Sequence, residues 1–579
     1  MSHSTPMATT ESGPATMVTP TPRSSMTFTN SRPPPVPGSR GAAGDVAALQ
    51  REITRDEKLI SRYGGDDVHA PEPKAPVEKP APPAPARDPN MVVWDGPDDP
   101  ANPQNWSVGY KWFLTAMCML MCVNVTFASS APASASGRII AEFGISPEVS
   151  YLVTTTFLLG YCFGPLFWGP GSELIGRRNI FVLSMFMYTI FILGQALAKN
   201  IETLLVTRFI SGFFACAPLT NSGGVIADIW DAKGRGLAVS LFTASVFLGP
   251  VLGPIVAGFI AHSSTTWRWV FWVMMIFAGV CSICVFFVPE TYAPVLLLRK
   301  AKRMRKEDPV ANKEIFAEHE KQDWSPKGIA KRTVLRPFAM LAMEPILVLV
   351  TLYLSLVYGL LYALFQAIPV IFIQHKHFNI AETGLIFIGV GIGTTLGSAI
   401  NLWTSRIYPE LIVKWRGFPP PENRLISAMI GSPVLVVGCF WLGWTGQYES
   451  VHWAVPAVST IFVGAGISLI FMGFLSYLVD TYLMFSASAL AANTVVRSAV
   501  AAAFPLFTVQ MFHNLGVNWA CTLIGLLMLL FVPAPFLFYK YGPTIRSKST
   551  FAPCIDLKIA AAIKAEENAL SEKNARLSV

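Results

Sequence analysis

Two arginines stand inside long apolar segments of this chain, where a charged side chain is rare. Arg208 lies in the segment 202–222, and Arg497 lies about 16 Å into the segment that begins at Ser486, at 1.5 Å per helical residue. A guanidinium inside a membrane costs several kcal/mol unless it faces a cavity or a partner, so both are functional candidates. The alternative for Arg208 is hydrogen bonding to backbone or polar groups between helices. Asp480 is a candidate partner of Arg497, although the spacing does not require that pair.

A turn with paired charges joins the second and third apolar segments. Its residues 169–178 include Gly169 and Gly176, which permit a tight turn and a close approach of helices. Glu173 precedes Arg177 and Arg178, so an acid and two bases can form a charge-assisted latch that opens as helices rock. The alternative is a turn that only sets the membrane topology.

Two Gly-Pro pairs are spaced four residues apart in the fifth apolar segment. Gly249, Pro250, Gly253 and Pro254 predict a smooth, kinkable surface for close helix packing. A helix in water would be broken by these residues, whereas a membrane helix tolerates them. The alternative is a packing seam with no role in mechanism.

Aromatic side chains of the seventh apolar segment predict a substrate cavity. Tyr358, Tyr362 and Phe365 share one helical face at i, i+4 and i+7. An aromatic, weakly polar cavity suits bulky amphipathic compounds, although such a stripe is also typical of helix packing. The other residues that we expect in the cavity are Asn124, Phe127, Gln366, Phe474, Tyr477, Asn493 and Arg497.

Several kinds of chemistry find no support in the sequence. The apolar segments contain no His cluster, no H-E-x-x-H and no paired acids, and the chain has no phosphate-binding G-x-x-x-x-G-K-[ST] loop. Cys281 and Cys284 form a single C-x-x-C inside an apolar segment, where cysteine behaves as a small hydrophobic residue. His375 and His377 are interpreted as solvated loop residues. We therefore expect neither an enzyme nor an ATP-driven pump, and no cofactor or metal.

The composition predicts a membrane protein made only of helices. The 579 residues are 52% hydrophobic and 14% charged, against about 25% charged residues in soluble domains. Each apolar segment is long enough to cross a hydrocarbon core of about 30 Å. Six segments, a polar loop and six more segments predict two six-helix halves around a central cavity. The segments lie near 110–133, 148–168, 179–198, 202–222, 237–261, 268–288, 343–370, 382–405, 425–445, 453–479, 486–512 and 517–541.

The same pattern divides the chain into five parts. We expect a disordered N-terminal tail over 1–93, which is rich in Pro, Ser and Thr and poor in apolar surface. A first half over 94–288 and a second half over 343–541 flank a central loop over 289–342, and a C-terminal tail covers 542–579.

The basic residues predict the orientation in the membrane. Lys and Arg gather in the central loop and in the loops that join segments two and three, four and five, and eight and nine (loops 2–3, 4–5 and 8–9). The loops on the opposite side of the membrane contain few Lys or Arg residues. Cytoplasmic loops carry such an excess, so both termini are expected in the cytoplasm. The net charge of +8 therefore reflects topology and not nucleic-acid binding.

These motifs together resemble the major facilitator superfamily. The turn 169–178 is similar to its signature loop Gly-x-x-x-Asp-Arg-x-Gly-Arg-Arg, with Glu173 for Asp and Leu174 for Arg, which removes one partner of the latch. Leu204, Arg208 and Gly212 match a span-four motif, and the resemblance implies a role of Arg208 in proton coupling.

Other segments resemble the fungal drug:proton antiporters with twelve spans. The residues 245–254 are similar to the antiporter motif Gly-x-x-x-Gly-Pro-x-x-Gly-Gly, with Ser245 and Pro254 as departures. The segments 94–100, 289–291, 477–482 and 491–498 also match that branch.

The resemblance implies a proton-coupled antiporter that exports hydrophobic or amphipathic drugs, toxins or secondary metabolites. An exporter dedicated to one endogenous metabolite or polyamine, or an importer of the same fold, remains an alternative. Few acidic side chains lie in the spans, which disfavours polyamines. We expect a monomer in the plasma membrane, with the vacuolar membrane as the alternative, and small molecules, protons and lipid as partners.

Overall fold

A computed structural model describes residues 90–577 of the chain, except 97, 322–324 and 416. Most of the predicted N-terminal tail, residues 1–89, lies outside this described part. Within it the chain is helical, and the regular structure includes one isolated bridge between Met91 and Phe316 but no strand. The class predicted from the sequence, a membrane protein made only of helices, is confirmed.

Twelve spans account for the two predicted six-helix halves. Eleven helical stretches of the described chain are long and apolar enough to cross a membrane, and the last of them contains two spans. The first half contains α2 (Val108–Ser130), α4 (Pro147–Ile175), α5 (Arg177–Ala196), α6 (Ile201–Ile229), α7 (Ala232–His262) and α8 (Arg268–Val285). The second half contains α12 (Pro345–Pro369), α14 (Phe387–Thr404), α16 (Ile426–Gly446), α17 (Ala454–Tyr482), α18 (Ser486–Phe531) and α19 (Pro533–Arg546).

The eleventh and twelfth spans are separated at Gly516. This residue has φ +78° and ψ 160°, a left-handed conformation that glycine adopts without steric cost. The N–H of Val517 donates to Oε1 of Gln447 at 2.7 Å, so the end of α16 supplies the acceptor that the broken helix lacks. The predicted segments 486–512 and 517–541 therefore meet at the observed break.

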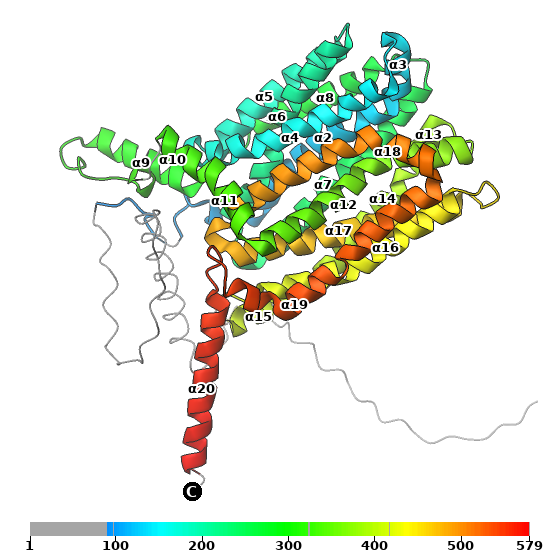
Figure 1. Ribbon diagram of the computed structural model, residues 1–579. Coiled ribbons are helices and arrows are strands. Elements are labelled where there is room, and N and C mark those ends of the chain that lie inside the picture. The colour runs from blue at the N-terminus through cyan, green and yellow to red at the C-terminus, as the bar shows by residue number, and fades with distance from the viewer. Residues whose placement is uncertain (1–89, 97, 322–324, 416, 578–579) are drawn as a thin grey trace, which may run out of the picture. The chain divides into compact units, whose positions relative to one another are not determined.

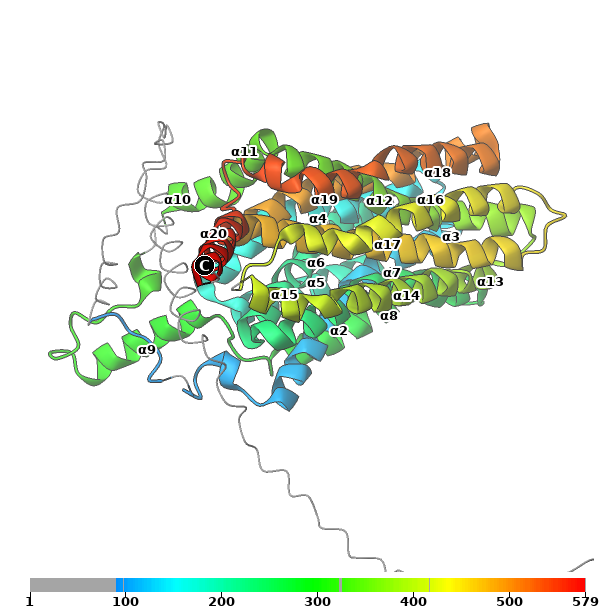
Figure 2. The same ribbon diagram turned by 90° about the horizontal axis from the view of Figure 1, so that it is seen from below.

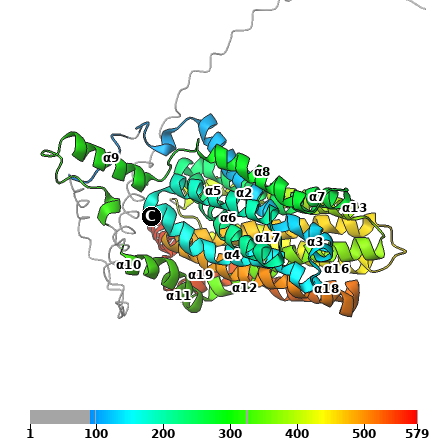
Figure 3. The ribbon, with the colours of Figure 1, turned by 90° about the horizontal axis from the view of Figure 1, so that it is seen from above.

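Further helices lie at the two ends of the bundle (Figures 1, 2 and 3). We call the end at which α2 begins the terminal side, and the opposite end the far side. The far side carries α3 (Ser136–Phe143) and α13 (Ile380–Leu385). The terminal side carries α9 (Ala293–Glu307), α10 (Pro326–Ala330), α11 (Arg336–Met343), α15 (Tyr408–Lys414) and α20 (Ile555–Leu577).

The two halves meet along two seams. The helix α4 lies against α18, and α7 lies against α13 and α14. Each seam joins the second span of one half to the fifth span of the other, as expected for two related repeats. Hydrogen bonds cross the first seam, since Thr155 Oγ1 donates to the carbonyl of Ala502 at 2.8 Å.

The outer surface of the spans suits a lipid environment. Large apolar side chains such as Phe167, Ile283, Trp403 and Leu530 are more than 60% exposed. An apolar surface of this kind is stable in hydrocarbon, where helices satisfy their own backbone groups.

Candidate functional site

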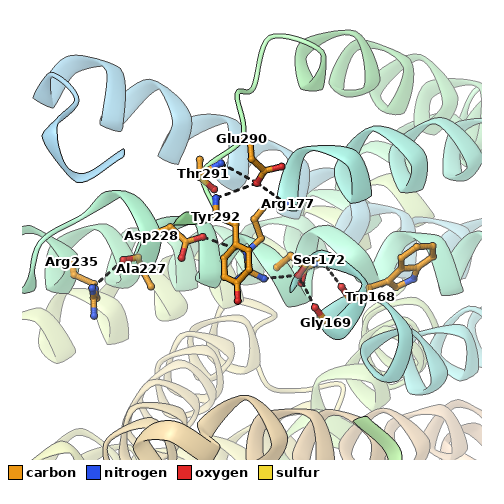
Figure 4. A network of polar contacts seen from close by, with 11 residues as sticks. Trp168, Gly169, Ser172, Arg177, Ala227, Asp228, Arg235, Glu290, Thr291 and Tyr292 are labelled. Carbon is orange, nitrogen blue, oxygen red and sulfur yellow. Dashed lines mark hydrogen bonds and ion pairs between the residues drawn. The ribbon is translucent and has the colours of Figure 1, made fainter. Parts of the chain in front are cut away.

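A polar network surrounds Arg177 at the terminal side of the first half (Figure 4). The guanidinium donates to Ser172 Oγ at 2.5 Å and pairs with Asp228 through Nε at 3.4 Å. Its carbon Cζ lies 4.9 Å from the centre of the Tyr292 ring, and the backbone N–H of Arg177 donates to Glu290 Oε1 at 2.9 Å. The start of α5 is therefore tied to the ends of α4, α6 and α8.

Gly176 allows Glu290 to approach the turn. The residue has φ +97°, and a Cβ at this position would overlap the carboxylate of Glu290. That carboxylate is 4% exposed, accepts the N–H of Thr291 at 3.1 Å and lies 3.6 Å from Nη2 of Arg299. A buried acid is thus surrounded by donors at the point where the chain leaves α8.

The predicted latch residues occupy different places in this network. Gly169 accepts the hydroxyl of Ser172 at 2.7 Å, and Arg178 donates to the carbonyl of Phe286 at 3.1 Å. The backbone carbonyl of Glu173 accepts from Nε2 of His319 at 2.9 Å. The acids that face Arg177 are instead Asp228 and Glu290, which our sequence analysis did not assign to the latch.

Arg208 is fully buried in the first half. Its Nε donates to the carbonyl of Val153 and its Nη1 to the carbonyl of Ala128, both at 2.9 Å. The guanidinium lies 4.1 Å from the centre of the Phe157 ring, and its Nη2 has no partner among the described residues. In this conformation Arg208 joins α6 to the backbones of α2 and α4, and its role in proton coupling stays a prediction.

The Gly-Pro segment of α7 packs closely against α2, whose small side chains and backbone meet the glycines. A Cβ at Gly249 would overlap Thr126 Oγ1, and a Cβ at Gly253 would overlap Ser130 Oγ. Pro250 lies next to the first of these glycines inside the helix. Small residues are what permit two membrane helices to pack backbone to backbone.

The same helix forms the second seam between the halves. A Cβ at Gly258 would lie 2.9 Å from the carbonyl of Ile380, and one at Gly384 would lie 2.6 Å from the carbonyl of Pro254. The far half of α7 therefore touches both α2 and α13, with little space along either contact.

Three predicted cavity residues, Tyr358, Tyr362 and Arg497, form a central cluster with Ser129 and Phe471, two residues that the sequence did not single out. The hydroxyls of Tyr358 and Tyr362 are 3.4 Å apart, and Tyr362 donates to Ser129 Oγ at 2.9 Å. The guanidinium carbon of Arg497 lies 4.7 Å from the ring centre of Tyr358 and 5.3 Å from that of Phe471. This cluster, which we call the central cluster, joins α2 of the first half to α12, α17 and α18 of the second.

Other predicted cavity residues lie inside the second half. The ring of Tyr477 stacks on Phe538 at 6.1 Å, and Phe474 meets the same ring edge-on at 6.4 Å. Asn493 Nδ2 donates to Thr351 Oγ1 at 3.3 Å. These three side chains pack α17 and α18 against α19 and α12.

The remaining predicted cavity residues are all buried. Phe365 meets Tyr362 edge-on at 5.4 Å and so borders the central cluster, and Gln366 follows it along α12. Phe127 packs edge-on against Phe277 of α8 at 6.2 Å. Both amide atoms of Asn124 lack a partner among the described residues.

A family model described as Major Facilitator Superfamily matches residues 112–505. The chain belongs to the major facilitator superfamily. Among solved structures, the proton:xylose symporter XylE covers 75% of this chain and 96% of its own, with a TM-score of 0.55 and 18% identity. At that identity the likeness shows the shared fold alone.

Three curated relatives of this major facilitator come from fungi. The "Ascochitine biosynthesis cluster MFS transporter" of Didymella fabae is 44% identical over 475 residues, which cover 81% of this chain and 90% of the relative. The "Citrinin biosynthesis cluster MFS transporter mrr1" of Monascus ruber is 40% identical and covers 87% and 100%. The "Major facilitator superfamily multidrug transporter mdrA" of Aspergillus fumigatus is 42% identical and covers 80% and 76%. The predicted resemblance to fungal drug and metabolite transporters is confirmed.

A second charged cluster of this major facilitator lies at the terminal side of the second half. Nε of Arg424 is 2.8 Å from Oδ2 of Asp480, and the hydroxyl of Tyr408 donates to the same oxygen. Asp480 therefore pairs with Arg424 of the loop 8–9 and not with Arg497. The second half thus has its own acid–base contact near its terminal-side loop.

The chain after α19 is fixed to that same side by a C-terminal clasp formed by Glu344, Glu422, Arg546 and Asp556. The side chain of Arg546 is 1% exposed and lies 2.9 Å from Glu422 and 2.7 Å from Asp556. Glu344 accepts the N–H of Thr550 at 3.0 Å, so it binds the segment after α19 rather than the N-terminus of its own helix. Buried carboxylates with two or more donors make strong charge-assisted contacts.

Proposed function

We propose that this chain is a proton-coupled antiporter of the plasma membrane that exports hydrophobic or amphipathic small molecules. The printed names of its relatives, which include a multidrug transporter and transporters of metabolite clusters, support the class of cargo. A dedicated exporter of one metabolite is the second candidate, because several relatives carry the name of a single biosynthetic cluster.

The contact of α7 with α2 is the observation that carries the proposal. Gly249 and Gly253 bring the two helices together so closely that any side chain would separate them. A seam of this kind restricts the passage of solutes between the helices, so movement of substrate and proton depends on a change of the whole bundle. The resemblance of this segment to the antiporter motif gives the direction of export.

The terminal side is proposed to face the cytoplasm. Basic residues of the loops 2–3, 4–5 and 8–9 and of α9 lie at this end. On the far side, Arg268 pairs with Glu142 at 2.5 Å, and Lys376 donates to the carbonyl of Val451 at 2.7 Å. An excess of Lys and Arg on one side of the spans is the usual mark of the cytoplasmic face.

Two polar groups are proposed to couple proton movement to the conformational change of the whole bundle. The network around Arg177 is the conformational latch, because it joins the ends of four spans through one ion pair and charge-assisted hydrogen bonds that can separate when the helices move. Arg208 joins α6 to α2 and α4. An arginine keeps its proton in proteins, so Arg208 acts on the helices and another group carries the proton.

The proposal is tested by the accumulation of labelled amphipathic drugs and metabolites in cells with and without the protein. Export predicts a lower accumulation, and a protonophore uncoupler should abolish the difference. Gly249→Leu should abolish export, whereas Gly279→Leu is the matched control because a Cβ there meets nothing within 4 Å. Higher accumulation in cells that carry the protein would contradict the direction, and export that persists with the uncoupler would contradict the coupling.

A further inference from the structure

Arg497 is a buried cation without an ionic partner among the residues that the structure describes. The residue is 8% exposed, and its Nε has no hydrogen-bond partner among the described residues. Its contacts are the faces of two aromatic rings, Tyr358 and Phe471. Rings can stabilise a guanidinium through cation–π attraction, but they leave its in-plane N–H donors unused.

Among the described residues, the middle of the bundle contains no acid that could neutralise this charge. Within the described helices that span the membrane, every Asp or Glu lies within three residues of a helix end. Asp480 of α17 is already paired with Arg424 at the terminal side. The two arginines in the middle of the spans, Arg208 and Arg497, therefore give the interior a positive charge.

Arg208 and Arg497 differ in how many of their N–H donors form hydrogen bonds within the protein. Arg208 donates to two backbone carbonyls within the first half. Arg497 donates no hydrogen bond within the part of the chain that the structure describes, and it belongs to α18, which forms a seam with α4 of the other half. Arg497 is thus the cation that lies where the halves meet and whose donors are available to a ligand.

We infer that Arg497 binds an anionic group of the exported compound, so that the cargo is an aromatic or amphipathic organic anion. This inference rests on the proposed export function. A planar guanidinium can hold a carboxylate by two parallel hydrogen bonds. The rings of Tyr358 and Phe471 then cover the apolar body of the ligand, and the hydroxyls of Tyr362 and Ser129 offer further polar contacts.

The anion preference is tested by binding to the purified full-length protein, separately from transport. Matched aromatic acids and their neutral amides, built on naphthalene, anthracene and anthraquinone, compete for the protein against a tritiated acid of the same panel. The acids should bind about tenfold more tightly than their amides, as expected for a charge-assisted contact. Arg497→Gln should remove the difference, and Arg497→Lys should retain part of it.

Arg424→Gln is the control, since it removes the same charge from the terminal side of the same half. It should leave the preference for acids unchanged. Amides that bind as tightly as acids across the panel, or a preference that survives Arg497→Gln in folded protein, would overturn the inference. Uncoupler-sensitive export from cells is scored in parallel, and its absence would contradict the proposed function whatever the binding assay shows.

Discussion

At the scale of single residues, the interior of the first half depends on Arg208. Its two hydrogen bonds end on backbone carbonyls of α2 and α4, so the residue holds three spans together. The sequence could single out this arginine because a charge in an apolar segment is conspicuous. It could not reveal the partners, because carbonyl groups are present at every position and only the fold decides which two are near.

Replacement of Arg208 by alanine separates its two interpretations. If the residue couples protons to transport, Arg208→Ala should reach the cell surface normally and lose uncoupler-sensitive export. If it only holds helices, thermal unfolding in detergent should show a stability lower by about 1–3 kcal/mol, the cost of leaving buried partners unpaired, while residual export stays uncoupler-sensitive. Arg208→Lys is the control, because it keeps the charge but lacks the guanidinium fork. Intact coupling in a stable Arg208→Ala protein would contradict the proposed coupling role.

The acids that contact Arg177 could not be identified from the sequence alone. Glu173 is close to Arg177 in the sequence, whereas Asp228 and Glu290 are 51 and 113 residues away. Sequence proximity favoured Glu173, but the turn at Gly176 directs the start of α5 toward the ends of α6 and α8. The signal available in the sequence was Glu290, an acid directly after the sixth span. Only the packing shows that this acid is buried and faces the start of α5.

At the scale of elements, helical segments were predictable and their faces were not. Apolar length alone located twelve spans, since each must cross the same thickness of hydrocarbon. The face that each span turns inward depends on its neighbours. Tyr358 and Tyr362 belong to the central cluster, whereas Phe474 and Tyr477 turn toward α19; that Tyr358 and Tyr362 line a substrate cavity stays a prediction. Nearly uniform apolarity around α17 leaves no periodic signal that would distinguish the two cases.

The C-terminal clasp consists of charged residues, so a hydropathy pattern could not reveal it. Whether the clasp holds the segment after α19 can be tested by the reactivity of Cys554. Burial raises the pKa of this thiol, and its Sγ donates to the carbonyl of Arg546 at 3.2 Å. At neutral pH the thiolate fraction is therefore small and labelling by a maleimide should be slow. Arg546→Gln breaks a buried ionic contact with two acids, at a cost of about 3–5 kcal/mol, and should release the segment and speed up labelling by about tenfold or more.

The labelling of Cys554 is measured by mass spectrometry of the C-terminal peptide over time. Lys548→Gln is the control, because this side chain is exposed and lies in the same segment. An unchanged labelling rate in Arg546→Gln would show that the segment is held by other contacts, such as those of Glu344.

At the scale of the whole bundle, the two halves are bound to each other along the far part of both seams. Gly258 and Gly384 bring α7 and α13 together, and Gln510 Nε2 at the far end of the first part of α18 donates to Glu148 Oε1 at the start of α4 at 3.1 Å. The sequence predicted two six-helix halves by counting spans, but it could not say which spans meet or at which side they close. Those contacts depend on pairing between residues hundreds of positions apart.

Alternating access requires these far-side contacts to separate during each transport cycle. The double variant Glu148→Cys/Gln510→Cys places thiols at the ends of α4 and α18, and a short bis-methanethiosulfonate reagent can join them. We expect the cross-link to abolish uncoupler-sensitive export and a reducing agent to restore it, because the joined ends keep the far side closed. The single variants and the treated wild type control for reaction at native cysteines, most of which are buried. Full export by a quantitatively cross-linked protein would mean that substrate leaves without separation of α4 from α18, and the cycle would then have to open along α7 and α13 instead.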